Sequence, residues 1–403
     1  MTRGADDDPS GIATYSQAGA QFGYGLLWTM ILTYPLMAAV QLVSAHIGRV
    51  TGAGLGKNLG RVFPHPVVSL LVTILLIANI FNIGADLSAM AAAAQLVGGG
   101  SSHIYVILFA LLAVGLQLFI PYRQYSSVLK WLTLSLLAYV GVILLVHIDW
   151  PQALLGMIWP RNLGMTALLT VVAVLGTTIS PYLFFWQSSQ EAEEIAASQG
   201  KALREAPTAV SRQYRRIRYD TLAGMALSNL VALAIMLATA ATLHAKGVTT
   251  IDSAAQAADA LRPIAGRFAF LLFAIGIIGT GLLAVPVLAG SAAFAVSETH
   301  GWSAGLEFKP HQAMRFYAII VGATFVGVLM DWSNISPIKA LVWSAVLNGV
   351  AAVPIMAAMM MVASNRRIMG HLHERRGILR FGWTATAIMA LASGATLVAA
   401  ISS

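Results

Sequence analysis

Long apolar runs separated by short polar segments make up almost the whole chain. Gly, Pro and charged clusters bound these runs, and many extend for about twenty residues, enough for a helix to cross a hydrocarbon core about 30 Å thick. The pattern predicts about eleven membrane-spanning helices. The first surrounds residues 4–16, and the others are Tyr24–Ala45, Val67–Val97, Ile104–Ile120, Val128–Ile148, Met165–Ser189, Leu222–Leu243, Phe268–Val296, Phe316–Leu329, Pro337–Ala363 and Phe381–Ile401.

The composition indicates a chain embedded in a membrane rather than a soluble domain. Of the 403 residues, 58% are hydrophobic and only 10% are charged, and the mean hydropathy is +0.76. Soluble proteins carry about 25% charged residues. We therefore expect a single all-α polytopic membrane domain over residues 1–403. The absence of cysteine excludes disulfides, thiolate metal ligands and thiol catalysis.

Basic residues are unevenly distributed among the segments that join the predicted helices. If the N-terminus lies in the cytoplasm, all but five of the 24 Lys and Arg residues fall on the cytoplasmic side, as the positive-inside rule requires. We therefore predict a multi-pass protein of the cytoplasmic (inner) membrane with a cytoplasmic N-terminus. The net charge of +8 then reflects topology and contact with membrane lipid, and no nucleic-acid partner is expected.

Two predicted helices carry helix-breaking sequences at corresponding positions. Proline removes a backbone donor and glycine lowers helix propensity, so both helices should unwind there. Unwound backbone at membrane depth offers its carbonyls to a cation when it lines a cavity. In the simpler alternative, an acidic N-cap precedes proline in an ordinary helix, and the second proline makes a kink. The two sequences are Asp8-Pro9-Ser10-Gly11 in the first helix and Ile179-Ser180-Pro181-Tyr182 in the sixth.

Breaks that lie five helices apart indicate two inverted repeats with a binding site at the membrane midplane. We expect repeat one over about residues 1–148, repeat two over about residues 165–363 and an additional eleventh helix at about 381–401. Asp8 is then the first candidate ligand, because an acidic residue within a membrane usually has a function.

Several stretches of the sequence resemble one known family. They are "DDDPSG" and "ATYSQAGAQFG" at the first break, "NIFNIGADLSAM" in the third helix, "GTTISPYLFFWQSS" in the sixth and "SNRRIMG" after the tenth. Together they are similar to the Nramp divalent-metal transporters, which have the LeuT-type fold of five plus five helices in inverted repeats. Only seven residues precede Asp8, where the family has a half-helix. The resemblance implies a secondary transporter that works by alternating access and is not an enzyme.

The resemblance also implies the metal-binding positions. The metal-binding Asp of the family matches Asp8, its Asn matches Gly11, its Met matches Ser180 and its His matches Tyr182. This pattern is more similar to the Nramp-related magnesium transporter branch than to the manganese and iron importers. Without a soft thioether the site keeps oxygen ligands, which suit a partly hydrated Mg²⁺. We expect Asp8 to hold the ion, surrounded by Gly11, carbonyls near Thr177 and Thr178, and the Ser180 hydroxyl; the ion is substrate, not cofactor.

The third predicted helix carries a polar stripe of Asn79, Asn82 and Asp86, whose spacing places them on one face. By resemblance, Asn79 and Ala89 match two glutamates linked to proton movement, and Gln187 matches a second histidine. The side chains at these positions titrate poorly near neutral pH. We therefore expect Asn79, Asn82, Asp86, Tyr182 and Gln187 to line a pathway that does not require protons. Hydrogen bonding between helices is the alternative role for the two asparagines, and Asn348 in the tenth helix is a further candidate for the cavity.

The leading hypothesis is a transporter or facilitator of Mg²⁺ and Mn²⁺ without obligatory proton coupling and without an obligate protein partner. The main alternative is a proton-coupled Mn²⁺ or Fe²⁺ importer. A membrane hydrolase would need paired catalytic carboxylates or a nucleophile motif, which the sequence lacks. A sodium-coupled carrier of organic solutes does not explain the metal-type motifs. Glu191, Glu193 and Glu194, at the end of the sixth helix, fit either a cation exit or a solvated helix end.

Overall fold

The structure is a computed structural model that describes residues 8–129, 131–160, 164–198, 201–205, 210–333, 335–372 and 376–402. All regular elements in these ranges are helices. Ten segments of the described chain are long and apolar enough to cross a membrane, and they correspond to the second to eleventh predicted helices. The α-helices are α1 (Pro9–Phe22), α2 (Trp28–Thr51), α3 (Leu55–Leu59), α4 (His65–Gly98), α5 (Ser102–Phe119), α6 (Tyr122–Leu129), α7 (Leu137–Leu145), α8 (Trp150–Ile158), α9 (Met165–Thr178), α10 (Pro181–Ala197), α11 (Val210–Thr242), α12 (Ala254–Ala258), α13 (Arg262–Ala265), α14 (Ala269–Thr299), α15 (Met314–Leu329), α16 (Pro337–Ser364), α17 (Arg366–Met369) and α18 (Arg376–Ser402).

Two of the predicted helices differ from expectation. Within the described residues, α1 has 14 residues, which at 1.5 Å per residue give a length of about 21 Å. This helix is therefore too short to cross a bilayer by itself. The fifth predicted helix is not regular, because the chain passes through a 3-10 turn, η2 (Leu132–Leu136), before α7 begins.

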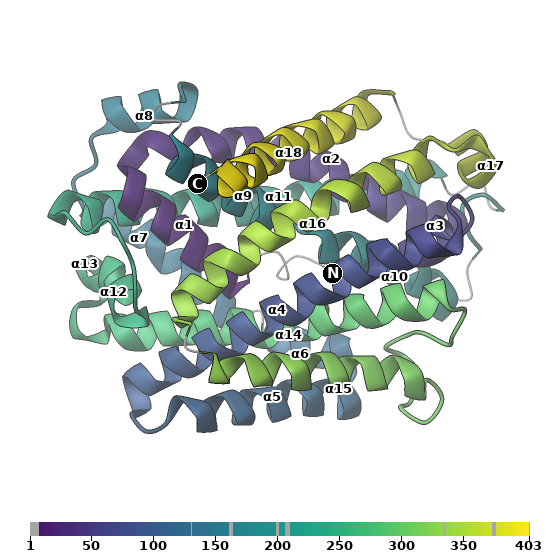
Figure 1. The fold of residues 1–403 in the computed structure, drawn as a ribbon, viewed down its shortest axis with the longest axis horizontal. Coiled ribbons are helices and arrows are strands. Elements are labelled where there is room, and N and C mark those ends of the chain that lie inside the picture. Colours follow the sequence, from purple (N-terminus) through teal and green to yellow (C-terminus); the bar gives the residue numbers. More distant parts are fainter. Residues whose placement is uncertain are drawn as a thin grey trace.

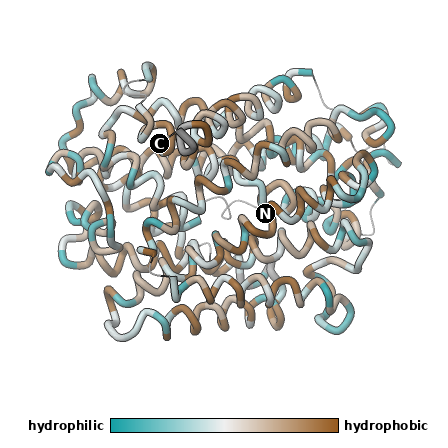
Figure 2. Tube along the Cα trace, viewed as in Figure 1, coloured by the Kyte–Doolittle hydropathy of each residue, from teal (hydrophilic) through white to brown (hydrophobic). Residues whose placement is uncertain are grey.

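The long helices run in similar directions through the molecule (Figure 1), with α3 and α17 at one end and α8, α12 and α13 at the other. Figure 2 shows apolar residues along the middle of the bundle and polar residues gathered near both ends. This distribution is typical of helices whose middle parts lie in hydrocarbon. We call the end with α3 and α17 the basic end, because Arg49 and Arg366 lie there, and the opposite end the vestibule end.

Close helix contacts hold the sixth predicted helix in place. α4 lies at the centre and packs against α5, α14, α15 and α16, while α9 packs against α16 and α10 against α2 and α14. A Cβ on Gly176 would collide with the backbone of Ala345 and Gly349 on α16, and a Cβ on Gly48 would collide with the backbone of Ser188 on α10. Small residues let membrane helices approach closely, so these glycines fix α9 and α10 beside their neighbours and position the break between them.

Ion pairs join the helices at the basic end. Arg216 on α11 donates to Glu191 at 2.7 Å and to Glu194 at 2.9 Å, both on α10. Arg49 on α2 lies 3.7 Å from Glu191. Two of the three glutamates that the sequence suggested for a cation exit or a solvated helix end are thus engaged by arginines, whereas Glu193 accepts hydrogen bonds from the Leu306 N–H and from Gln190. α10 is thereby tied to α2 and α11.

Candidate metal centre

The local chemistry of Asp8-Pro9-Ser10-Gly11 explains why α1 begins there. Asp8 is extended (φ −85°, ψ 166°), its carboxylate accepts a hydrogen bond from the Gly11 N–H at 2.8 Å, and Pro9 occupies the first turn. The Ser10 hydroxyl donates to the same carboxylate oxygen, Oδ1, at 2.7 Å. The N-cap interpretation of this motif is therefore correct as local structure. A carboxylate has about four acceptor positions, so the cap leaves Oδ2 for other partners.

The Asp8 carboxylate is buried, with the residue 1% exposed, and it joins three helices. Asn82 on α4 donates from Nδ2 to Oδ2 at 3.1 Å, and Thr177 on α9 donates from Oγ1 to Oδ1 at 3.4 Å. Among the described residues, no Lys or Arg forms an ion pair with Asp8. A buried carboxylate with hydrogen bonds but no counter-charge is a group that a cation stabilises.

Further oxygen atoms lie beside this carboxylate. The amide oxygen of Asn82 is buried and has no hydrogen-bond partner in the described part of the chain. The hydroxyls of Ser10 and Thr177 lie 3.3 Å apart. A Cβ on Gly11 would lie 3.2 Å from Thr177 Oγ1 and 3.6 Å from Asp8 Oδ1, so glycine leaves room next to the carboxylate. One carboxylate, one amide oxygen and two hydroxyls form a hard ligand set.

The second break separates α9 from α10. Ile179 leaves the helical region (φ −114°, ψ 59°), Ser180 is extended (φ −78°, ψ 132°), and Pro181 starts α10. The break falls near the middle of the 33-residue apolar segment Met165–Ala197 and therefore at membrane depth. The predicted interruption of the sixth helix is confirmed. At the first break, the chain before Asp8, with Asp6 and Asp7, lies outside the described residues.

The hydroxyls at the second break have different partners. Ser180 donates to the carbonyls four and three residues before it, at 2.7 and 2.9 Å. Thr178 donates to the carbonyl four residues before it, at 2.7 Å. Of the hydroxyls of Thr177, Thr178 and Ser180, only that of Thr177 bonds Asp8. The structure thus brings Asp8, Gly11 and Thr177 together, whereas the Thr178 and Ser180 hydroxyls bond the preceding turn.

The polar stripe on α4 divides into three environments. Asn82 contacts Asp8, as described above. Asn79 donates to a backbone carbonyl of α14 at 2.9 Å and to the Ser291 hydroxyl at 2.8 Å, which is the interhelical bonding considered as its alternative role. Asp86 is fully buried, and within the described chain neither of its carboxylate oxygens has a hydrogen-bond partner. One face of α4 therefore carries a packing contact, a contact to Asp8 and a second acid.

The two predicted pathway residues of α10 are buried but differ in position. Tyr182 is fully buried in the first turn of α10. Gln187 lies further along, and its amide oxygen accepts a hydrogen bond from Gln41 on α2 at 3.5 Å. Gln187 therefore contributes to the contact between α10 and α2.

Two residues near the centre had little or no signal in the sequence. Ser10 was not a candidate, although a hydroxyl two residues after a capping Asp can bond it. Asn348 on α16 is fully buried, and both of its amide atoms lack partners among the described residues. It precedes Gly349, where α16 touches α9, so its closeness to the break depends on packing that a sequence does not display.

The donor set around Asp8 differs from a conventional metal cluster. In the described ranges, no three His, Cys, Asp or Glu side chains gather where they could hold a metal ion. The single carboxylate and its neutral oxygens instead suit an ion that keeps several of its waters, which is the usual behaviour of Mg²⁺.

Comparison with known proteins places these features in context. A family model described as natural resistance-associated macrophage protein-like, Nramp, matches residues 1–399. The divalent metal cation transporter MntH of Klebsiella pneumoniae subsp. pneumoniae is 27% identical over 410 residues, which cover 98% of this chain and 91% of that protein. The protein of the same name from Erwinia tasmaniensis is 27% identical over 402 residues, which cover 97% of this chain and 91% of that protein.

Solved structures share the fold. The manganese transporter of Eremococcus coleocola matches with a TM-score of 0.75 at 17% identity, covering 97% of this chain and 83% of that one. Mhp1, a nucleobase-cation-symport-1 family transporter, matches with a TM-score of 0.51 at 12% identity, covering 96% and 92%. The predicted fold class, an all-α polytopic bundle of the LeuT type, is confirmed, while the bounds of the two repeats stay a prediction.

Proposed function

The chain belongs to the Nramp family, and from that premise we propose that it transports the divalent cations Mg²⁺ and Mn²⁺ across the cytoplasmic membrane by alternating access around Asp8. Two relatives that match nearly all of the chain are named divalent metal cation transporters. A protein of the same fold is named a manganese transporter. In this proposal the metal ion is the substrate, and the protein is neither an enzyme nor dependent on a resident cofactor.

The observation that supports the choice of ion is the oxygen set at Asp8. Within the described residues, the buried carboxylate has no counter-charge, and the amide oxygen of Asn82 beside it has no hydrogen-bond partner. Rotation of the Asn82 amide would present that oxygen to an ion, and the Ser10 and Thr177 hydroxyls can accept a bond from its waters. Mg²⁺ usually binds through one or two carboxylates and keeps much of its hydration.

The position of the family's methionine supports the same conclusion. Ser180 stands there, and its hydroxyl donates to two carbonyls of α9. A thioether would favour softer transition metals. A site without one should bind Mg²⁺ and Mn²⁺ with similar strength, which supports the proposal that this chain belongs to the magnesium-transporting branch of the family.

The replaced titratable residues support transport without obligatory proton coupling. Asn79 is bonded to α14 and Gln187 to Gln41, and amides do not exchange protons near neutral pH. Two charges that cross a potential of 100 mV release about 4.6 kcal/mol, enough to drive uptake without protons.

We assign the basic end and the N-terminus to the cytoplasm. Arg49, Arg216 and Arg366 lie at or near this end, and segments rich in Lys and Arg face the cytoplasm in membrane proteins. The vestibule end then faces the outside and is where the cation enters.

Competition between the two ions in liposomes that contain the purified protein tests the proposal. Mn²⁺ uptake is measured against rising Mg²⁺ with a pH dye inside. We expect Mg²⁺ at about 100-fold excess to suppress most Mn²⁺ uptake, because hard oxygen ligands distinguish little between the two ions, and we expect no acidification. Uptake that resists this excess would contradict a role for Mg²⁺, and acidification that follows metal entry would contradict uncoupled transport.

Proton-coupled import of Mn²⁺ or Fe²⁺ is the second candidate, and one observation favours it. Asp86 is a fully buried acid without a hydrogen-bond partner in the described chain, so it could carry a proton. If protons are coupled, the Asp86→Asn variant should take up metal without the acidification that the wild type shows. If they are not, neither protein acidifies the liposomes.

A further inference from the structure

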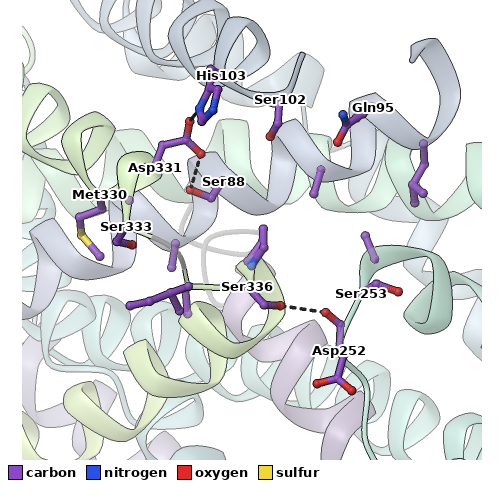
Figure 3. Close-up of a pocket in the computed structure, with 18 of the residues that line it drawn as sticks. Ser88, Gln95, Ser102, His103, Asp252, Ser253, Met330, Asp331, Ser333 and Ser336 are labelled. Carbon is purple, nitrogen blue, oxygen red and sulfur yellow. Dashed lines mark hydrogen bonds and ion pairs between the residues drawn. The ribbon is translucent and has the colours of Figure 1, made fainter. Parts of the chain in front are cut away.

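A cavity of about 420 Å³ opens at the vestibule end, separate from the contacts around Asp8. Its wall is formed by α4, the first residues of α5, the chain before and within α12, the 3-10 turn η7 (Met330–Trp332) and the start of α16. Figure 3 shows Asp331 on one side of the cavity between His103 and Ser88, with Asp252 and Ser336 on the opposite side. At about 30 Å³ per water, a divalent ion with six waters needs roughly 200 Å³. A hydrated dication therefore fits.

Acidic side chains line the cavity. Its lining contains Asp331 and Asp252 but, among the described residues, no Lys or Arg. Asp252 is half exposed and is neutralised by Lys339 at 3.0 Å, near the rim. Asp331 also lines the cavity, and its side chain is only 9% exposed. A cleft with one sign of charge and low-dielectric walls concentrates counter-ions.

The contacts of Asp331 leave one oxygen available to an ion. His103 donates from Nδ1 to Oδ2 at 2.5 Å, and its ring stacks on Trp332, so the carboxylate is held in one orientation. From the described residues, the other oxygen, Oδ1, receives only a long contact of 3.4 Å from the Ser88 hydroxyl. Oδ1 can therefore accept a water of a hydrated ion or bind the ion itself.

α4 connects this cavity with the centre. Ser88 lines the cavity, Asp86 is buried two residues earlier, and Asn82 contacts Asp8 four residues before that. Six residues of helix span about 9 Å. The cavity wall and the metal centre are thus less than two turns apart on α4, and Asp86, which lies between them on a different face from Ser88, has no hydrogen-bond partner within the described chain.

We propose that this cavity is a capture site for hydrated divalent cations, in which Asp331, oriented by His103, holds the ion before it moves to Asp8. The inference rests on the proposed function for the direction of transport. It adds a second, weaker binding site that should determine how efficiently the protein collects ions at low concentration.

The first test is the concentration dependence of Mn²⁺ uptake by Asp331→Asn. Asparagine can still accept the His103 hydrogen bond, so only the charge is lost. We expect KM to rise about fivefold, the effect of a partly buried charge contact, while Vmax stays within about twofold of wild type. Asp259→Asn, which removes a partly exposed carboxylate paired with Arg262 outside the cavity lining, is the control and should change neither value. An unchanged KM in Asp331→Asn, or an equal rise in the control, would overturn the capture site.

The second test separates this inference from the proposed function. Binding of Mn²⁺ alone is measured by electron paramagnetic resonance on Asp8→Ala and on Asp8→Ala with Asp331→Asn. We expect Asp8→Ala to keep one weak site that the double variant loses. Loss of all binding in Asp8→Ala would overturn the capture site but leave the proposed function standing. Full uptake by Asp8→Ala would overturn the proposed function instead.

Discussion

The two helix breaks at the centre of the bundle have the same backbone arrangement but different side-chain hydrogen bonds. In each, an extended polar residue precedes a proline that starts a new buried helix: Asp8 before Pro9, and Ser180 before Pro181. Asp8 directs its carboxylate to the N–H of its own helix and to α4 and α9. Ser180 makes no cap of this kind, and its hydroxyl turns back to the last carbonyls of α9. Proline explains the break in both cases, but the capping side chain decides what the break offers an ion.

This difference suggests that the two breaks have different roles in ion binding. The first provides the negative charge, which a dication needs for binding in a low-dielectric interior. The second provides a neutral wall, from which Thr177 reaches the carboxylate while the other hydroxyls stabilise the end of α9. If this is right, substitutions at the first break should change affinity, and substitutions at the second should change selectivity or fine geometry.

The largest effect is expected for Asp8→Ala. It removes the carboxylate that joins α1 to α4 and α9, and even indirect partners of metal ligands cost about 10- to 100-fold when they are lost. We expect Mg²⁺ and Mn²⁺ affinity to fall by at least about 100-fold and uptake to disappear, as measured by titration calorimetry and liposome flux. Asp259→Ala serves as the exposed carboxylate control. If Asp8→Ala retains its affinity for metal, the first break contributes no charge to metal binding, and the proposed difference between the two breaks is wrong.

The sequence predicts the backbone of the centre better than its side-chain contacts. Asp-Pro and Ser-Pro within apolar runs point to broken helices because the effect of proline is local. Asn79 and Asn82 share a face of α4, yet one bonds α14 and the other bonds Asp8. Their spacing along α4 cannot distinguish these two roles, because the helices that contact each turn of α4 come from distant parts of the chain.

The sequence also does not predict the side-chain contacts of Thr177 or those in the cavity at the vestibule end. The Ser180 hydroxyl bonds the Thr177 carbonyl, and the Thr177 side chain bonds Asp8, which the sequence did not indicate. A role for the carbonyls near Thr177 and Thr178 in ion binding stays a prediction. Asp331 and His103 are more than 200 residues apart in the chain, and only the packing of η7 against α4 and α5 brings them to one cavity. Contacts between residues so far apart in the chain produce no periodic pattern in the sequence from which they could be predicted.

The next largest effect is a change in ion preference for Ser180→Met, which places a thioether at the neutral break. Soft ligands favour Mn²⁺ and later transition metals over Mg²⁺. We expect the ratio of Mn²⁺ to Mg²⁺ affinity to rise about tenfold, measured by competition uptake. Ser180→Ala removes the hydroxyl without adding sulfur and should leave the ratio near that of the wild type. An equal change in both variants would show that the freed carbonyls, rather than the thioether, set the preference.

A smaller effect is expected for Gly11→Asn, which adds a side chain beside the charged break. A Cβ there would lie 3.2 Å from Thr177 Oγ1 and 3.6 Å from Asp8 Oδ1, so the amide must enter the space next to the carboxylate. We expect Mg²⁺ affinity to fall about fivefold because the ion loses room for its waters, with a smaller loss for Mn²⁺, which dehydrates more readily. Gly11→Ala adds the Cβ alone and separates crowding from ligation. A greater loss for Mn²⁺ than for Mg²⁺ would contradict a site shaped for hydrated magnesium.

The smallest effect concerns Thr177, the side chain of the second break that bonds Asp8 of the first. Thr177→Val keeps the shape but removes a hydroxyl that donates to Asp8 at 3.4 Å, a long and therefore weak bond. We expect KM for Mg²⁺ to rise about threefold, because a hydrogen bond of this kind contributes about 0.5–1.5 kcal/mol at most. Thr178→Val is the matched control, since its hydroxyl bonds only carbonyls of its own helix, and it should alter thermal stability without altering KM. If both variants raise KM equally, the hydroxyls act through the stability of α9, and the second break is only a scaffold with no direct contact to the ion site.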